Sequence, residues 1–484
     1  MTTDIGILSF GAYVPRGRLQ RQAVYAANAW FAPGLRGLAK GERATANWDE
    51  DTITMAVEAA RDTLVGIDRA QVGTVSLAST TLPFADRLNA GVVKEALVLD
   101  DATAAIDVTG SQRAATSQLI QALNAAGSAA RPHLALATEM RKARPASEGE
   151  LVYGDAAAGV LVGQGDVIAR FLGSHSTTID FVDHFRSTGA EFDYTWESRW
   201  IRDEGYTGLI GAAIKAALAK FGVEGAAIDR FIVPITLRGV ADGLAKRAGV
   251  KAEAVVESLS QTVGEAGVAH ATLLLAAALE AAAPGEKILL VGFGQGVDVL
   301  LFETTAAIAN LPARRGVKGS IARGAKTDNY MRFLFHRGLL GLDRGMRAEA
   351  DQKQPGTTLW RNRKAVFGLV GGRCTKTGTV QFPKSDISVN PNDHAIGTQE
   401  DYPLADVAAK IVTYTADSLT YSPNPPSYYG LIDFEGGGRM MAEFADVDPS
   451  DVEVGRDMMM MFRIKSVDEM RDFTKYFWKA VPVA

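Results

Sequence analysis

Residues 105–121 read AIDVTGSQRAATSQLIQ, and this stretch decides the fold. A short apolar run is followed by a small-residue turn at Gly110 and Ser111 and then by an Ala-rich run. This order is typical of a strand, a tight turn and a helix. Such a turn places the side chains that follow the strand at the N-terminus of the helix, where backbone N–H groups lack partners. The stretch therefore predicts one unit of an α/β fold, with Gln112 at its turn.

The same alternation of strands and helices continues up to about residue 305. Residues 52–64 predict a helix with a polar start at 49–51. Short apolar runs predict strands over 5–10, 72–79, 104–108, 133–138 and 156–162. Strands that alternate with helices are typical of an α/β layered fold.

Residues 258–293 look like a second copy of the unit at 107–138. The second copy has the turn TVGEAGVAHA at 262–271, an Ala-rich helix and the strand ILLVGF. Small residues let two such helices pack closely, and their N-termini supply N–H groups that can stabilise an oxyanion or a thioester carbonyl. Periodicity alone fits two ordinary Ala-rich core helices equally well.

Composition excludes several classes of protein. The net charge of −5 argues against a nucleic-acid binder, which is normally basic. The single cysteine, Cys374, excludes an internal disulfide framework and fits a reducing compartment. The N-terminus lacks the pattern of a signal peptide. The apolar run at 271–283 is too short to span a bilayer and contains Glu280. We expect a cytoplasmic protein with no membrane partner.

The composition changes after residue 305. Residues 313–326, ARRGVKGSIARGAK, are basic and rich in glycine, and residues 329–350 predict a helix. Beyond Trp360, apolar runs between Gly and Pro clusters predict strands over 366–370, 380–382, 408–414, 429–434 and 458–464. We therefore expect an α/β domain at 1–305, a basic and helical linker at 306–358, and a small β-barrel domain at 359–484.

Six further blocks accompany the opening stretch: GAYVPRGRL at 11–19, WDEDTITMA at 48–56, YGDAAAGVLVG at 153–163, TTIDFVDHFRSTGAEF at 177–192, WESRWIRDEGY at 196–206 and PGEKILLVGFGQG at 284–296. In this order and spacing they resemble the hydroxymethylglutaryl-CoA synthase-like, ketoacyl synthase III-like branch of the thiolase superfamily. The resemblance implies a five-layered α/β/α/β/α domain, a homodimer, and carbon–carbon bond chemistry on a CoA thioester.

The C-terminal part resembles the acyl-CoA-associated OB-fold domain with a rubredoxin-like zinc ribbon. The matching blocks are LWRNRK at 359–364, GGRCTKTGTVQFP at 371–383, VNP at 389–391, DVDPSDVEVG at 446–455 and YFWK at 476–479. A structural zinc site needs four Cys or His ligands. Only Cys374 remains, Thr377 and Ser388 stand where ligands are expected, and His394 is a stray candidate. We expect no metal.

The catalytic residues that the resemblance implies are also missing. The branch uses a cysteine nucleophile, a histidine and a glutamate. These positions fall on Gln112, on Pro234 and within 79–81. An amide is no nucleophile, so the resemblance implies chemistry without a cysteine acyl-enzyme. Ser111 lies beside Gln112, but a serine without a paired base is a weak nucleophile.

Four other side chains are candidates for a catalytic role in proton transfer. His270 begins the second Ala-rich helix, and Glu265 lies in the turn before it. His184 lies in VDHFR, a region that lines the substrate tunnel in the resembled branch, and His175 lies near it. Each has a structural alternative, as a satisfied core histidine or as an acid at a helix N-terminus.

Basic side chains are candidates for binding the phosphates of CoA. They are Arg238, Arg314, Arg315, Lys318, Arg323 and Lys326. A solvated basic linker explains the segment at 314–326 equally well.

The sequence and the resemblance together predict an acyltransferase-type enzyme. It would form or cleave a carbon–carbon bond of a β-keto acid or β-ketoacyl substrate, with CoA or acyl-CoA as co-substrate. One alternative is a decarboxylase of a β-keto or malonyl thioester, in which Gln112 orients the substrate. Another is a non-catalytic, acyl-CoA-binding scaffold.

Overall fold

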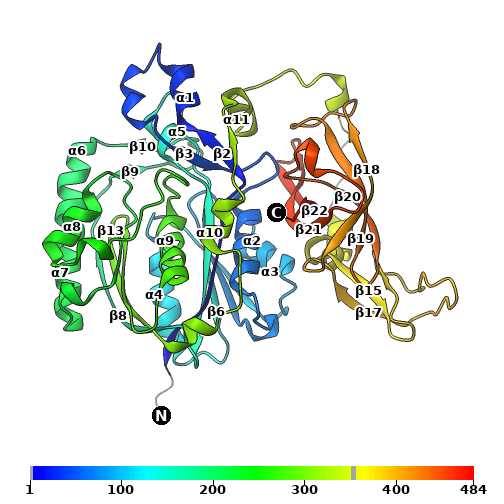
Figure 1. Cartoon of the computed structure of the whole chain (residues 1–484), viewed down its shortest axis with the longest axis horizontal. Helices are drawn as coiled ribbons and strands as arrows, with labels where there is room; N and C mark the ends of the chain where they lie inside the picture. Colours follow the sequence, from blue (N-terminus) through cyan, green and yellow to red (C-terminus); the bar gives the residue numbers. More distant parts are fainter. Residues whose placement is uncertain (1–3, 350–355, 484) are drawn as a thin grey trace. The chain divides into compact units, whose positions relative to one another are not determined.

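The computed structural model describes residues 4–349 and 356–483, which form two compact units (Figure 1). The first unit holds the described residues up to Asn47, together with Asp51–Gly91 and Asp100–Leu339. The second holds Trp48–Glu50, Val92–Leu99 and the described residues from Leu340 on. The second unit therefore includes two short pieces of the N-terminal sequence.

A nine-stranded sheet forms the frame of the first unit, in the order β11-β12-β13-β8-β1-β7-β6-β4-β5. Strands β1 and β8 pair only at Gly6–Arg170 and Ile7–Ala169, so the sheet divides there into two halves. The strands are β1 (Ile5–Tyr13), β4 (Thr74–Ala78), β5 (Ala104–Val108), β6 (His133–Glu139), β7 (Ala156–Gln164), β8 (Ala169–Thr178), β11 (Arg230–Ile232), β12 (Lys287–Phe293) and β13 (Gly296–Thr304). The strands predicted from the sequence are confirmed.

Helices α4 (Ala114–Ala126) and α9 (Val268–Ala281) lie side by side between the two half-sheets (Figure 1). Alternation along β12 shows the layering, because Ile288 and Leu290 pack in the core that contains α4 and α9. Leu289 and Val291 pack on the opposite face, against α7 (Gly211–Phe221) and α8 (Val240–Ala248). Helix α2 (Thr52–Thr63) covers β1 and β7. The expected five layers are confirmed.

Helix α2 begins where the polar residues predicted it. The side chain of Asp51 accepts a hydrogen bond from the backbone N–H of Thr54, and the hydroxyl of Thr54 accepts one from the backbone N–H of Asp51. The two bonds form a capping box. All but Arg61 of its residues are buried. A helix buried on nearly every side belongs to the core, and its start is held firmly.

Residues 306–339 pack within the first unit. Helix α10 (Gly316–Ala322) contacts α9 and β1, and β14 (Ala325–Thr327) pairs with β2 (Gly17–Gln20). The helix predicted over 329–350 is wrong in length, because α11 spans only Tyr330–His336. It ends at Gly338, whose φ of +68° suits a C-terminal turn. Residue 350 lies outside the described residues.

The second unit is mainly antiparallel β-structure. One sheet has the order β20-β19-β18-β21-β22 and another the order β16-β15-β17. The strands are β15 (Val370–Cys374), β16 (Val380–Gln381), β17 (Gln399–Pro403), β18 (Ala409–Asp417), β19 (Ser427–Phe434), β20 (Arg439–Glu443), β21 (Asp457–Asp468) and β22 (Phe473–Pro482). The strand predicted over 366–370 is wrong, because helix α13 (Arg363–Gly368) occupies most of it. The indole of Trp478 donates to the carbonyl of Phe367 at 2.6 Å, which fixes this helix on β22.

A buried ion cluster lies inside the second unit. The fully buried guanidinium of Arg463 lies 3.0 Å from Glu50 and 2.8 Å from Asp446. Lys479 lies 3.0 Å from Asp49 and 4.1 Å from the centre of the Trp48 ring. The segment Trp48–Glu50 thus supplies two of the carboxylates and the aromatic ring that surround these cations.

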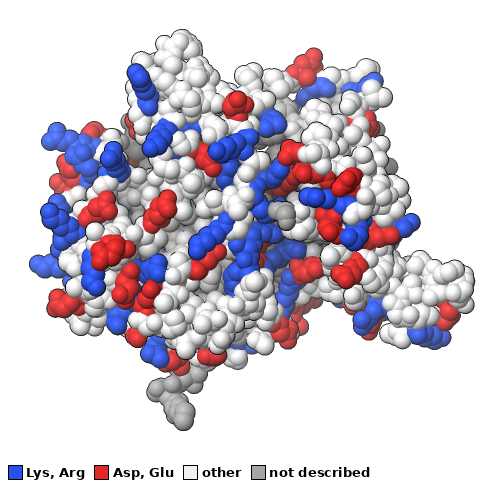
Figure 2. Space-filling view, in the orientation of Figure 1, with Lys and Arg blue, Asp and Glu red and all other residues white. Residues whose placement is uncertain are grey.

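Several broader expectations concern the whole chain. Within 4–349 and 356–483, no helix is long and apolar enough to cross a membrane. In the same residues, no three His, Cys, Asp or Glu side chains gather as metal ligands. Thr377 instead bonds to Thr379 in the turn after Cys374. Figure 2 shows Lys and Arg interleaved with Asp and Glu on the face in view.

Candidate functional site

The turn between β5 and α4 is seated on the turn between β12 and β13. The hydroxyl of Ser111 and the Nε of Arg113 both donate to the carbonyl of Gly294, each at 2.9 Å. Arg113 also lies 2.8 Å from Asp298. A Cβ at Gly294 would meet Ser111 at 2.8 Å, so only glycine allows this approach. The Ser111 hydroxyl is thus used in the turn, and its hydrogen bonds to the described residues join it to backbone groups of Gly294 and Arg113.

Gln112 points toward the start of α9. Its Nε2 lies 3.4 Å from the Thr80 hydroxyl, and its buried Oε1 has no partner among the described residues. Because Thr80 gives its one proton to Glu139, the Gln112 atom that faces it must be the donor, Nε2. Oε1 then faces Gly267, where a Cβ would come within 2.9 Å of it.

Glu139, at the end of β6, is the central carboxylate of the site, and the sequence reasoning missed it. It is fully buried and accepts from the hydroxyls of Ser79 at 3.2 Å, Thr80 at 3.0 Å and Thr81. The N–H of Val268, at the start of α9, also donates to it at 3.3 Å. A charged residue that ends an apolar strand was the available signal. The resemblance placed a catalytic glutamate within residues 79–81. In the structure, the hydroxyls of these residues bind a glutamate from β6, Glu139.

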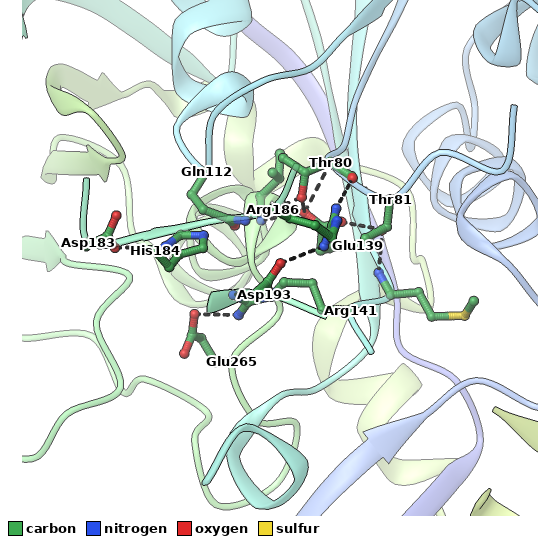
Figure 3. A network of polar contacts seen from close by, with 12 residues as sticks. Thr80, Thr81, Gln112, Glu139, Arg141, Asp183, His184, Arg186, Asp193 and Glu265 are labelled. Atoms are coloured by element: carbon green, nitrogen blue, oxygen red, sulfur yellow. Dashed lines mark hydrogen bonds and ion pairs between the residues drawn. The ribbon is translucent and has the colours of Figure 1, made fainter. Parts of the chain in front are cut away.

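Arg141 lies near Glu139 and interacts with two further carboxylates, Glu265 and Asp193 (Figure 3). It donates to Glu265 at 2.6 Å, lies 3.7 Å from Asp193 and stacks 3.8 Å from the ring centre of Tyr153. Asp193 also pairs with Arg186 at 2.7 Å. Burial opposes ionisation of Glu265, but the charge and hydrogen bond of Arg141 outweigh it and lower its pKa. Glu265 is therefore ionised at neutral pH, and its side chain is 32% exposed.

His184 enters the site from a short hairpin formed by β9 (His184–Phe185) and β10 (Tyr194–Thr195). Its Nδ1 lies 3.0 Å from Asp183, which the sequence reasoning also missed. Burial works against the charged imidazole, but the hydrogen bond and charge of Asp183 outweigh it and raise its pKa. Nδ1 therefore carries a proton toward Asp183, and the raised pKa favours the imidazolium, in which Nε2 also carries a proton that it can donate.

His270 lies close in sequence to Glu265 but is buried, so a ligand in the site cannot reach it. The residue is 1% exposed, and the N–H of Ala266 donates to its Nδ1 at 3.2 Å. Burial lowers its pKa to about 4, so the imidazole is neutral at pH 7. In this position it supports the turn that carries Glu265. His175, on β8, lies 3.4 Å from the hydroxyl of Thr177.

The structure does not bring the basic candidates at 314–318 to Gln112. Arg314 donates to Ser9 at 2.8 Å and to the carbonyl of Phe10. The backbone N–H of Arg315 donates to Asp62, and that of Lys318 donates to Glu280 near the C-terminal end of α9. That end lies about 20 Å from the start of α9, at 1.5 Å per residue.

The other three basic candidates lie elsewhere in the first unit. Arg238 is exposed in the loop before α8. Arg323 follows α10, and Lys326 is exposed on β14.

Two family models match parts of the chain. The C-terminal domain of 3-oxoacyl-[acyl-carrier-protein] synthase III matches residues 218–300, and the C-terminal OB-fold domain of ChsH2 matches residues 402–463. The first match contains Glu265, strand β12 and the first part of β13. The second contains β18, β19 and β20.

Known proteins resemble the chain over most of their own length. A hydroxymethylglutaryl-CoA synthase of Archaeoglobus fulgidus is 29% identical over 343 residues, which cover 69% of this chain and 98% of that protein. A structure of HMG-CoA synthase complexed with CoA aligns with a TM-score of 0.58 at 18% identity, over 72% of this chain and 94% of that one. 3-Oxoacyl synthase III of Pseudomonas aeruginosa aligns with a TM-score of 0.55 at 18% identity, over 62% and 98%.

These likenesses agree with the five layers, the paired central helices and the antiparallel second unit. The chain carries a thiolase-like α/β domain that is similar to hydroxymethylglutaryl-CoA synthase and 3-oxoacyl synthase III, followed by a C-terminal domain that matches the OB-fold domain of ChsH2.

Proposed function

We propose that this chain is a condensing enzyme of the acyltransferase type that acts on a CoA thioester without a cysteine acyl-enzyme. It makes or breaks a carbon–carbon bond next to a β-keto group, with CoA or acyl-CoA as co-substrate. The likeness to proteins named HMG-CoA synthase, one of them complexed with CoA, supports the thioester.

One observation carries the proposal: an amide, and no thiol, occupies the turn where α4 and α9 converge. Gln112 lies against Gly267 at the start of α9. The single cysteine of the sequence, Cys374, belongs to β15 in the second unit. An amide cannot accept an acyl group by attack, but it can hold a carbonyl in place by hydrogen bonding.

The groups around Gln112 suit proton transfer. Glu265 is ionised and partly exposed, and His184 is oriented by Asp183. In the cleavage direction, the thiol of CoA gives its proton to Glu265, and its sulfur adds to the β-keto carbonyl. The carbon–carbon bond then breaks, the new acyl-CoA leaves, and the enolate fragment takes a proton from His184. Gln112 orients the carbonyl under attack.

The test is to incubate the full chain with CoA and a panel of β-keto acids and β-ketoacyl thioesters. We expect loss of free thiol and a new acyl-CoA by mass spectrometry. Release of carbon dioxide with no new acyl-CoA would instead support decarboxylation. Bound CoA with no turnover of any substrate would support the scaffold.

The Cys374→Ser variant separates this mechanism from a cysteine-based one. Cys374 is buried and lies 3.1 Å from the Thr398 hydroxyl, a contact that serine can keep. We expect unchanged turnover and no inhibition of the wild type by iodoacetamide. Loss of turnover in a folded Cys374→Ser protein would show that the thiol takes part.

We also propose that the enzyme is a homodimer that pairs through β5. This strand is the last in the nine-stranded sheet, and Ile106 on it is 49% exposed. An unpaired edge strand with exposed apolar residues is a ready site for pairing with a second copy. Light scattering after size-exclusion chromatography should give twice the chain mass of 51.5 kDa, and Ile106→Lys should lower it toward one chain.

A further inference from the structure

A π-helix, η3 (Ile201–Ile210), follows the hairpin that carries His184. Its buried residues are Ile201, Gly205 and Ile210, spaced four and five apart. This spacing is wider than the 3.6 residues of an α-helical turn. Stretches of π-helix are rare and occur frequently at functional sites, because they rotate a side chain out of the ordinary helical pattern. Tyr206 is the side chain placed this way beside the buried Gly205.

The ring of Tyr206 is held firmly. It meets the ring of Phe293 edge-on, with 5.4 Å between the ring centres. The adjacent Gly205 has no room for a side chain, because a Cβ there would lie 2.7 Å from Phe181 and 3.3 Å from Phe293. Phe293 precedes Gly294, whose carbonyl holds the turn of Gln112. The same short segment therefore positions both Tyr206 and Gln112.

The hydroxyl of Tyr206 takes no part in these ring contacts. Among the described residues it forms no hydrogen bond, although the ring is largely covered. Burial raises the pKa of Tyr206, and the negative charges of Glu265 and Asp183 raise it further. The phenol thus stays protonated across the working range of pH. A protonated, positioned hydroxyl with no protein acceptor is a hydrogen-bond donor for a ligand.

We infer that Tyr206 donates a hydrogen bond to the thioester carbonyl of the substrate and stabilises the enolate oxygen that forms there. This inference rests on the proposed function and adds an oxyanion donor to it. The N–H of Val268, at the start of α9, already donates to Glu139. We therefore assign the donor role to the hydroxyl of Tyr206, on which the charge of the partly exposed Glu265 acts electrostatically. Positioned donors of this kind stabilise charge as it develops in the transition state.

Exchange of the methyl protons of acetyl-CoA in heavy water tests the inference without knowledge of the second substrate. The full chain is incubated with acetyl-CoA in D₂O, and deuterium uptake is followed by mass spectrometry. Tyr206→Phe keeps the ring against Phe293 and removes only the hydroxyl. We expect exchange to fall about 100-fold, the usual cost of one lost oxyanion donor, while acetyl-CoA affinity changes less than threefold.

The matched control is Tyr194→Phe, because Tyr194 is 57% exposed and its ring packs on Phe185 and Trp196. It should exchange like the wild type. Wild-type exchange in Tyr206→Phe would overturn the inference and leave the proposed function standing. Absence of exchange in the wild type, together with absence of turnover, would overturn the proposed function itself. If Tyr206→Phe lowers the melting temperature as well as the exchange rate, the residue has a packing role, and this result would also overturn the inference.

Discussion

Two buried arginines, Arg141 in the first unit and Arg463 in the second, are surrounded by carboxylates in different ways. Arg463 is fully buried, and its partners Glu50 and Asp446 are 1% and 4% exposed. Arg141 is also buried, but its partner Glu265 is 32% exposed. The carboxylates around Arg463 are therefore sealed from solvent, whereas Arg141 has one partner carboxylate that is partly exposed.

The difference teaches which kind of ion cluster can do chemistry. A sealed cluster holds segments together, and removing its cation leaves uncompensated buried charges. An open cluster keeps a charged group in a fixed position and leaves it accessible, as general acid–base catalysis requires. Residue types alone do not distinguish the two clusters, because both consist of arginine, aspartate, glutamate and an aromatic ring.

The largest effect on stability should come from breaking the sealed cluster. Arg463→Met keeps the length of the side chain but leaves Glu50 and Asp446 without their cation. We expect the free energy of unfolding to fall by about 3–5 kcal/mol in urea titrations. The control is Lys465→Met, which removes a half-exposed partner of Glu443 and should cost no more than about 1 kcal/mol. Equal costs in the two variants would contradict the assignment of a sealed cluster.

The next effect is a dependence of stability on pH, caused by the buried His270 below the turn that carries Glu265. The pKa of His270 is about 4 in the folded chain and about 6.5 when unfolded. The unfolded chain therefore binds more protons between these values, so the free energy of unfolding falls as the pH drops from about 6.5 to 4. The loss from this residue is at most about 3 kcal/mol. His270→Asn keeps an acceptor for the N–H of Ala266, and its unfolding curve should be flatter over that window; an unchanged slope would contradict the prediction.

A third effect should appear in rate. Glu265→Gln keeps the shape of the open carboxylate but removes its charge and its basicity. We expect turnover to fall about 100-fold, equivalent to about 2.7 kcal/mol, while the affinity for CoA changes little. Glu191→Gln is the matched control, because Glu191 is exposed and, in the part of the chain that the structure describes, forms an ion pair only with the exposed Lys142. If both variants keep wild-type turnover, Glu265 is not the base.

Local pattern was enough to predict the frame of the first unit. Apolar runs and the Gly110–Ser111 turn gave the strands, a layered α/β fold and the position of Gln112, because these depend on neighbours in sequence. The number of layers came from the family resemblance. The helix over 329–350 was wrong because Gly338 adopts a left-handed conformation that ends α11 early. The strand over 366–370 was wrong because α13 is fixed by Trp478, more than a hundred residues away.

The candidate site was harder to predict. Glu265 and His184 were candidates from the sequence because each lies in a distinctive block. Glu139, Asp183 and Tyr206 were missed because their roles depend on contacts between elements far apart in the chain, such as Glu139 with Thr81 and Val268. His270 looked like a catalytic group from its place at the start of α9. The sequence does not show that His270 is buried, and in the structure it supports the turn that carries Glu265.

The pairing of Asp49 with Lys479 joins residues 430 positions apart. During synthesis, at roughly 5–20 residues per second, the acidic segment at 48–50 leaves the ribosome tens of seconds before its cations exist. Until then two carboxylates and the Trp48 ring stand in water at the start of α2. The newborn chain therefore passes through a long interval in which its N-terminal half has formed neighbours but not its final partners. In that interval chaperones, and any second chain emerging from the same message, have access to this segment.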